Sequence, residues 1–297
     1  MQTQPKKKPQ VALESTIVAL GLPYPRNVEV GWKLARAVKA SGAEPRTMAI
    51  IDGMIKVGLS DDELERIAAG KNVQKLAASD LGPALALGGT GATTVSATCA
   101  LAYGAGIQVF ATGGIGGVHR EVVETFDESQ DLWALSKYPV AVVCAGAKAI
   151  LDLPRTMERL ESLGVPVVGF GTDELPAFYT RSSGIKLSHR VDTIEELARV
   201  VHFHFNLHPG SGILIANPIA AEHALDANFI QNAIDRALVE AREKSISGKA
   251  LTPWLLARLE GLTEGKSIEA NVALAESNAR LAGELSVRLA ALQEVET

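Results

Sequence analysis

Two kinds of hydrophobic pattern alternate along most of the chain. Short apolar runs rich in β-branched residues predict buried strands, and longer segments with apolar residues every three or four positions predict helices. Strands are predicted at 11–19, 48–51, 54–57, 73–76, 107–111, 140–144, 165–170 and 212–217. Helices are predicted at 28–40, after residue 60, from the glycine-rich stretch 88–94 to about 103, at 155–163, at 193–205 and from 228 onward. The order predicts a single α/β domain over 1–297 with a helical C-terminal layer.

Local signals sharpen some of these boundaries. Asp52-Gly53 between two short apolar runs predicts a hairpin turn. Ser60 with Glu63 three residues later matches a capping box, and Thr252-Pro253 matches an N-cap followed by a first-turn proline. Residues 1–9 are polar and predict a disordered tail.

Composition narrows the class of protein. Hydrophobic residues make up 47% of the 297 residues, which is enough for a large core, and the net charge of -5 argues against nucleic acid as a partner. No apolar run approaches the roughly 20 residues of a membrane span, and no signal peptide is evident, so we expect a soluble cytoplasmic protein without a membrane partner. Cys99 and Cys144 lie in apolar segments, which predicts two buried free thiols.

Chemically useful side chains follow two of the predicted strands. The strand 107–111 runs into four glycines at 113, 114, 116 and 117, and then His119 and Asp127 follow. The strand 140–144 leads to Lys148. Because ligands of open α/β sheets bind at the carboxyl ends of strands, these two ends predict a functional site.

Each of these side chains has a structural alternative. Lys148 either extends to solvent or is kept in a dry site as a nucleophile, which requires a lowered pKa. Glu14 interrupts the first strand, so it is either on an edge strand in solvent or buried for a functional reason. Asp127 either caps the helix that starts near Ser129 or joins His119 at a Mg²⁺ or Mn²⁺ site.

Two further patterns resemble functional sites only weakly. The stretch 88–94 lacks the lysine and the spacing of a nucleotide triphosphate-binding loop. Its glycines either permit close helix packing, which we favour, or let a helix N-terminus receive one phosphate or sugar hydroxyls. His202 and His204 lie about 200° apart on a helix, which disfavours a shared zinc ion with His208. No G-x-S-x-G motif is present, so a serine hydrolase is not predicted.

Longer motifs run in order along the chain. They are VALEST with Glu14, GATTV at 91–95, FATGGIGGVHR at 110–120, TFD at 125–127, VVCAGAK at 142–148, RSSG at 181–184, ANPI at 216–219, TPWLLARL at 252–259 and Glu-Ala-Asn at 269–271. Taken together, these motifs resemble those of the pseudouridine-5′-phosphate glycosidase family over nearly the whole chain. The resemblance implies a three-layer α/β/α sandwich around a mixed, largely parallel sheet. It also implies a homotrimer.

The resemblance further implies an enzyme that reversibly cleaves the bond between C1′ of ribose 5-phosphate and C5 of uracil, in pseudouridine catabolism. Lys148 matches the nucleophile, Glu14 the proton donor and Asp127 the ligand of Mn²⁺, with Mg²⁺ or another divalent ion as alternatives. The positions that match substrate-binding or pocket-lining residues are Lys75, Val95, Ser129, Gln130, Asp131, Thr112, His119 and Asn271.

The residue types suit this chemistry. Carbon is a harder leaving atom than oxygen or nitrogen, so a pair of carboxylates alone is insufficient. If Glu14 protonates the ribose ring oxygen, the ring opens and the Lys148 amine can hold C1′ as an imine, which lets the C–C bond break.

Some positions depart from the family pattern. Ala77 to Ser79 replace a usual Ser-Arg-Arg, Glu121 to Glu124 replace Gly-Ala-Glu-His, Glu128 and Gln130 flank Ser129 in place of Ile and Ala, and Leu20 replaces a usual His. These changes keep two alternatives open. One is a Schiff-base lyase or aldolase on another phosphosugar or C-nucleotide, and the other is a phosphosugar-binding module without activity.

Overall fold

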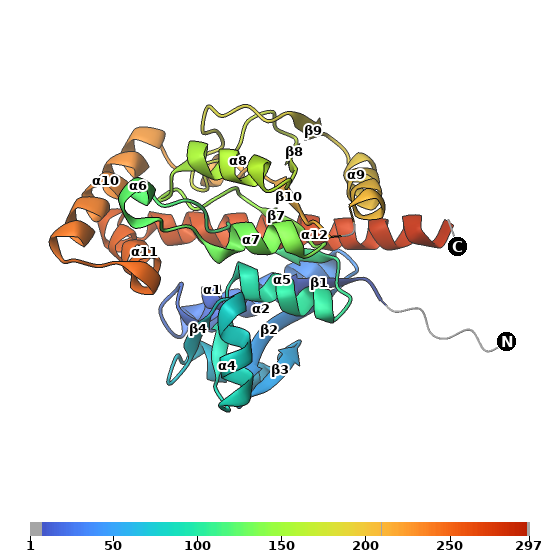
Figure 1. Cartoon of the computed structure of the whole chain (residues 1–297), viewed down its shortest axis with the longest axis horizontal. Helices are drawn as coiled ribbons and strands as arrows, with labels where there is room; N and C mark the ends of the chain where they lie inside the picture. The colour runs from blue at the N-terminus through green and yellow to red at the C-terminus, as the bar shows by residue number, and fades with distance from the viewer. Residues whose placement is uncertain (1–7, 209, 296–297) are drawn as a thin grey trace.

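A wide central sheet organises the computed structural model, which describes residues 8–208 and 210–295 (Figure 1). The described strands form one ten-stranded sheet in the order β4-β5-β2-β1-β6-β7-β10-β8-β9, with β3 paired to β2. Their bounds are β1 Gln10–Leu13, β2 Glu44–Ile51, β3 Met54–Val57, β4 Gln74–Leu76, β5 Gly91–Thr93, β6 Val109–Ala111, β7 Ala141–Cys144, β8 Val167–Phe170, β9 His189–Val191 and β10 Ile213–Ala216. All pairs are parallel except β2 with β3 and β2 with β5.

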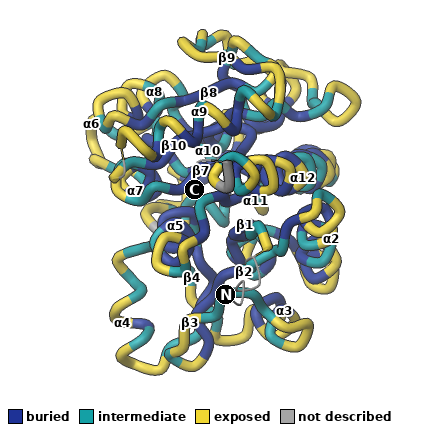
Figure 2. The backbone as a smooth tube through the Cα atoms, turned by 90° about the vertical axis from the view of Figure 1, so that its right-hand side faces the viewer, coloured by how far each residue is buried: buried dark blue, intermediate teal, exposed yellow. Residues whose placement is uncertain are grey.

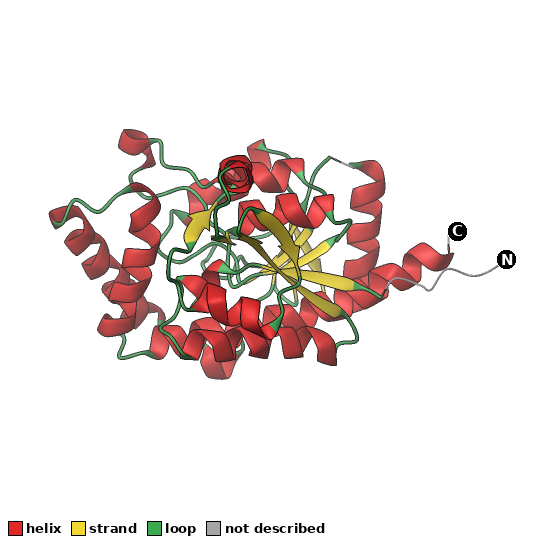
Figure 3. Ribbon diagram, turned by 90° about the horizontal axis from the view of Figure 1, so that it is seen from below, coloured by secondary structure: helices red, strands yellow, loops and turns green. Residues whose placement is uncertain are grey.

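Helices cover both faces of this sheet (Figure 3). Their bounds are α1 Thr16–Ala19, α2 Arg26–Ala40, α3 Asp61–Ala68, α4 Leu81–Ala86, α5 Val95–Gly104, α6 Val122–Thr125, α7 Gln130–Lys137, α8 Leu153–Ser162, α9 Ile194–Leu207, α10 Ala227–Glu243, α11 Leu251–Leu262 and α12 Lys266–Val295. Helices α2 and α12 lie on one side of the sheet, and α5, α7 and α8 lie on the other (Figure 2). The long helix α12 packs on both α2 and α9. This arrangement confirms the predicted sandwich with a mixed, largely parallel sheet.

The core lies where the inner strands meet the helices. Strands β1, β6, β7 and β10 are buried almost throughout, which explains their nearly continuous apolar sequences. Phe110 and Val142 are both fully buried on neighbouring strands. Burial of such side chains is the main favourable contribution to folding, at about 25 cal/mol per Å² of apolar surface.

The first predicted strand is shorter and more central than expected. It ends at Leu13, and α1 begins at Thr16. Strand β1 pairs with β2 on one side and with β6 on the other, so it is an interior strand. The alternative that places Glu14 on an edge strand in solvent is therefore wrong, because both edges of β1 are occupied and Glu14 is only 8% exposed.

Two helix starts also differ from the prediction. Gly91–Thr93 forms β5 in the sheet, so α5 begins only at Val95. Helix α11 begins at Leu251, directly after a 3₁₀ turn at Gly248–Ala250, and its N-cap is Ala250. Thr252 and Pro253 therefore lie inside the first turn of α11, because the 3₁₀ turn before them runs directly into the helix.

Other local predictions are confirmed. Asp52 and Gly53 both have positive φ angles, 49° and 72°, at the turn between β2 and β3. Ser60 and Glu63 form the predicted capping box of α3. Cys99 and Cys144 are free and buried, and burial raises the pKa of Cys144 to about 12.

The N-terminal tail prediction falls mainly outside the described residues, since residues 1–7 are not described. Lys8 forms an ion pair with Glu44 at 3.1 Å, and the carbonyl of Pro9 accepts a hydrogen bond from the Glu44 amide at 2.8 Å. Within the described ranges, no helix is both long enough and apolar enough to cross a bilayer.

Candidate active site

The order of the strands brings three chain segments together at the end of the sheet where the parallel strands finish. Strands β1, β6 and β7 are consecutive neighbours and run parallel, so their carboxyl ends lie side by side. Glu14 follows β1, the glycine-rich loop follows β6, and Lys148 lies four residues beyond the end of β7. The sheet thus joins groups that are more than a hundred residues apart in sequence.

Backbone hydrogen bonds continue past the strands and hold Lys148 in place. The Ala145 amide donates to Gly113 O at 2.9 Å, and the Ile115 amide donates to Gly146 O at 3.1 Å. The Lys148 amide then donates to Ile115 O at 3.0 Å. The lysine backbone is therefore anchored to the loop after β6, and only its half-buried side chain is free to reach the site.

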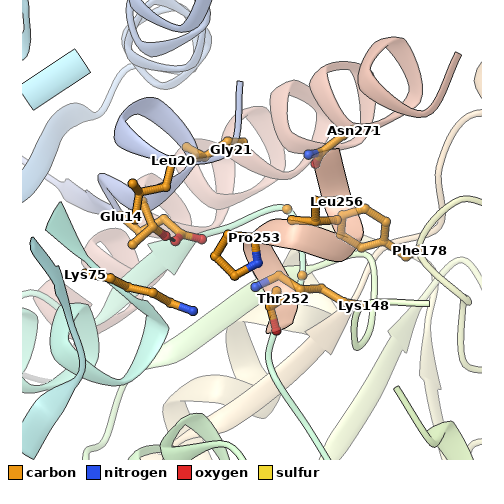
Figure 4. A pocket seen from close by; sticks show the side chains of 14 residues that line it. Glu14, Leu20, Gly21, Lys75, Lys148, Phe178, Thr252, Pro253, Leu256 and Asn271 are labelled. Atoms are coloured by element: carbon orange, nitrogen blue, oxygen red, sulfur yellow. Dashed lines mark hydrogen bonds between the residues drawn. The ribbon is translucent and has the colours of Figure 1, made fainter. Parts of the chain in front are cut away.

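Two cavities meet at these residues (Figure 4). The first, which we call the apolar slot, has a volume of about 60 Å³ and is walled mainly by Ile17, Leu20, Phe178, Pro253 and Leu256, with Asn271 as a polar group. The second, which we call the polar cavity, has a volume of about 280 Å³. Five residues line both cavities and form the junction between them: Glu14, Thr16, Lys75, Lys148 and Thr252.

The amine ends of Lys75 and Lys148 point into the same space at this junction, beside the Glu14 carboxylate (Figure 4). Lys75 comes from β4, the first strand in the sheet order, and lines both cavities at the junction. The structure therefore brings together the predicted nucleophile, the predicted acid and a predicted substrate-binding lysine.

Two threonine hydroxyls hold the Glu14 carboxylate. Thr112 donates to Oε1 and Thr16 donates to Oε2. Thr112 is 4% exposed and lines neither cavity, so it reaches the site only through Glu14. Thr112 was predicted to line the pocket. In the structure it instead supports Glu14 through a hydrogen bond, without lining either cavity.

One end of the polar cavity is formed by the N-termini of α5 and α7. Val95, Ser129, Gln130 and Asp131 all line it, and Ser129 is the N-cap of α7. Backbone N–H groups at a helix N-terminus attract anions, so a phosphate group is best placed where these N–H groups are not already bonded to Asp131 or Ser129.

Asp131 joins the walls of this end to each other. Its buried carboxylate accepts hydrogen bonds from the amides of Ser96 and Gly116, both at 2.8 Å. Glycine is required at 116, since a Cβ there would lie 2.2 Å from Ser129 Oγ. The Gln130 side-chain amide donates a hydrogen bond to Ser79 Oγ at 2.9 Å and accepts one from the Ser79 backbone amide at 3.1 Å.

His119 and Asp127 face the polar cavity as a pair. His119 Nε2 lies 3.8 Å from Asp127 Oδ2, and the His119 amide donates to the Asp127 carbonyl at 3.0 Å. Burial lowers the pKa of His119, the nearby Asp127 opposes that shift, and the charges of Lys75 and Lys148 lower it further. The ring is therefore neutral at neutral pH.

Replacing His119 by glutamine should make stability less sensitive to acid. The folded-state pKa of His119 lies below its unfolded value of about 6.5, so below that pH the unfolded chain binds the proton first and folding is weakened. We expect the urea midpoint of the wild type to fall more between about pH 7 and pH 5 than that of His119→Gln. The exposed His189 provides the control, because His189→Gln should decline like the wild type. Equal declines in all three proteins would contradict the assignment.

Asp127 can contribute one oxygen ligand to a metal ion. Its side chain is 34% exposed and lines the polar cavity. Among residues 8–208 and 210–295, no three or more His, Cys, Asp or Glu side chains gather to hold an ion. The donor set therefore fits a Mg²⁺-like or Mn²⁺-like ion that keeps most of its waters, and not a cage of protein ligands.

The three histidines of the disfavoured zinc site, His202, His204 and His208, have their contacts in and beside α9. His202 Nε2 is 2.9 Å from Asn206 Nδ2, and His204 Nε2 is 3.0 Å from Gly212 O, within and beside α9. His204 stacks near His208, with ring centroids 5.5 Å apart.

Sequence reasoning missed several residues of the junction and the slot. Thr16 and Thr252 line both cavities, and Phe178 and Leu256 wall the slot. Thr16 could have been found as a hydroxyl two positions after an acid in a buried strand. Phe178 and Leu256 carry no such signal, because apolar residues in loops and helices usually serve the core.

Comparisons with known proteins identify the family of the chain. The family described as Indigoidine synthase A like protein matches residues 1–288. Pseudouridine-5′-phosphate glycosidase of Caldanaerobacter subterraneus is 54% identical over 96% of this chain and 92% of its own length. The enzyme of that name from Solibacter usitatus is 52% identical over 95% of both chains.

Two solved structures share the fold. The prealnumycin C-glycosynthase AlnA, in complex with ribulose 5-phosphate, has a TM-score of 0.89 and 40% identity, over 97% of this chain and 93% of that one. An indigoidine synthase A-like protein from Thermotoga maritima has a TM-score of 0.89 and 34% identity, over 95% and 94%. With half of its residues identical to those relatives over nearly its whole length, the chain belongs to the pseudouridine-5′-phosphate glycosidase family, within the broader group of indigoidine synthase A like proteins.

Proposed function

We propose that the protein cleaves pseudouridine 5′-phosphate reversibly to uracil and ribose 5-phosphate, in pseudouridine catabolism. The names of its relatives support this activity. The observation that carries it is the position of Lys148 at the junction of an apolar slot and a polar cavity. We place the flat base toward the apolar slot and the phosphosugar in the polar cavity, so that the bond between them lies beside the amine.

The cavity walls suggest how the substrate is oriented. The phosphate meets the N-termini of α5 and α7, near Val95 and Ser129. Lys75 adds a positive charge where the sugar enters. The base lies against Phe178 and Leu256, and the Asn271 amide provides a donor and an acceptor for its polar edge.

The reaction then proceeds through an amine adduct. A proton delivered from Glu14 converts the ring oxygen into a hydroxyl as its bond to C1′ breaks, and the Lys148 nitrogen forms a bond to C1′. The bonded nitrogen loses one proton and uracil gains one at C5, so that the C1′–C5 electron pair returns to the base while the nitrogen lone pair forms the C1′=N imine. Water hydrolyses the imine, which releases ribose 5-phosphate and restores the lysine.

Asp127 would hold a divalent ion, Mn²⁺ in our proposal, at the sugar-phosphate side of the site. Such an ion supplies positive charge that fixes the phosphate through water. His119, neutral and beside Asp127, can hydrogen-bond the carboxylate or the sugar without adding charge. We also propose, on the family resemblance alone, that the enzyme is a cytoplasmic homotrimer, which light scattering can test.

Uracil release from pseudouridine 5′-phosphate tests both the activity and the ion. We expect turnover in the purified protein, loss of at least about 90% of it with EDTA, and recovery with Mn²⁺, because a substrate phosphate loses its positive partner. Asp127→Asn should need more Mn²⁺ for the same rate. Absence of uracil release would overturn the proposed function, whereas full activity in EDTA would overturn only the metal.

A second candidate is a Schiff-base lyase or aldolase on another phosphosugar or C-nucleotide. The wall of the polar cavity is the reason to keep this candidate. It contains the acids Asp80, Glu128 and Asp131 as well as Lys75 and Lys148, so its charge does not point to one phosphosugar alone. A structural neighbour is named as a C-glycosynthase with ribulose 5-phosphate bound. Turnover of another C-nucleotide or ketose phosphate, with none of pseudouridine 5′-phosphate, would select this candidate.

A further inference from the structure

The hydroxyl of Thr16 contacts Glu14, and both residues line the space where the substrate is proposed to react. Thr16 begins α1, two residues after Glu14, and its side chain donates a hydrogen bond to Glu14 Oε2. It lines both the apolar slot and the polar cavity.

The other oxygen of Glu14 is covered from behind. Oε1 accepts the hydroxyl of Thr112, which is 4% exposed and lines neither cavity. Glu14 itself is 8% exposed. Both carboxylate oxygens are therefore occupied by hydroxyl groups, but only the hydroxyl on Oε2 also faces the cavities.

We propose that Thr16 is a further catalytic residue, which relays the proton between Glu14 and the ribose ring oxygen. A hydroxyl can accept one hydrogen bond and donate another at the same time, so it can pass a proton on without carrying a charge. When Glu14 is protonated, its proton moves to Thr16 Oγ1, and the proton of Thr16 moves to the ring oxygen as the C1′–O bond breaks.

The relay balances without any other reactant. Glu14 becomes a carboxylate, Thr16 ends with one proton as it began, and the ring oxygen becomes a hydroxyl. In the reverse direction the same two protons move back. This inference rests on the proposed glycosidase activity, and it adds a role for a residue that the motif resemblance leaves without one.

Three variants test the relay. Thr16→Val keeps the shape and removes the hydroxyl, Thr16→Ser keeps the hydroxyl, and Thr112→Val removes the hydroxyl on the hidden oxygen. We expect Thr16→Val to lower kcat about 100-fold with little change in KM, since a general acid step contributes about 10²–10⁴-fold. Thr16→Ser should stay within about tenfold of the wild type, and Thr112→Val should lose about tenfold, because it weakens the support of Glu14 but leaves the path intact.

A proton inventory separates a relay from mere support of Glu14. In mixtures of H₂O and D₂O, kcat of the wild type and Thr16→Ser should follow a curve that needs two moving protons, and Thr16→Val should follow a straight line. Melting temperatures check folding, and Thr16→Ala replaces the valine variant if that one does not fold. The relay is overturned by a straight wild-type line, by Thr16→Val within about threefold of wild type, or by equal losses in Thr16→Val and Thr16→Ser. An inactive wild type instead contradicts the proposed function, and the relay with it.

Discussion

Lys148→Ala is expected to abolish uracil release from pseudouridine 5′-phosphate while the protein stays folded. The amine is the group that can form a covalent bond to C1′ at the junction of the two cavities. Removing the nucleophile of a covalent mechanism lowers kcat by about 10⁴-fold or more. Little stability is lost, because the side chain is only half-buried and its anchoring hydrogen bonds come from the backbone.

A matched lysine variant and a trapping experiment complete this test. Lys137 lies at the end of α7 with its amine over the Trp133 ring, outside both cavities, so Lys137→Ala should keep its rate. Borohydride added with ribose 5-phosphate should reduce an imine and add the sugar phosphate to Lys148. Undiminished turnover in Lys148→Ala would rule out the mechanism, and a label on Lys75 would move the nucleophile to that residue.

Gly146→Ala is expected to destabilise the protein severely. Gly146 has φ of +84°, and an added Cβ would lie 2.3 Å from the carbonyl oxygen of Pro176, which is backbone and has little room to move. Left-handed backbone costs a residue with a side chain about 1–2 kcal/mol, and the clash brings the total to about 4 kcal/mol or more. The same shift would displace Lys148, two residues further on.

Gly171 provides a control that separates the cost of the left-handed backbone from the cost of the steric clash. It also has a positive φ, +65°, but no heavy atom lies within 4 Å of an added Cβ. Gly171→Ala should therefore lose only about 1–2 kcal/mol, the cost of the backbone conformation. Urea unfolding of the two variants measures the difference. If both lose the same stability, the close approach between residues 146 and 176 does not constrain the fold.

Apolar patterning and local signals determined most of the elements. Runs such as 140–144 predicted buried strands because a parallel sheet covered on both faces needs apolar side chains throughout. The capping box at Ser60 and the turn at Asp52-Gly53 were predictable because their hydrogen bonds and φ angles depend on residues within a few positions. The motif around Lys148, with Glu14 and Asp127, also identified the family before any geometry was known.

Only the tertiary structure decided which of these residues meet. No local pattern states that β1 lies between β2 and β6, because strand order depends on how distant elements pack together. That order buries Glu14, sets it beside the loop after β6 and brings Thr16 to the junction. Phe178, Leu256 and Asn271 come from a distant loop and the C-terminal helices, so their place in the slot follows from packing that is non-local in sequence.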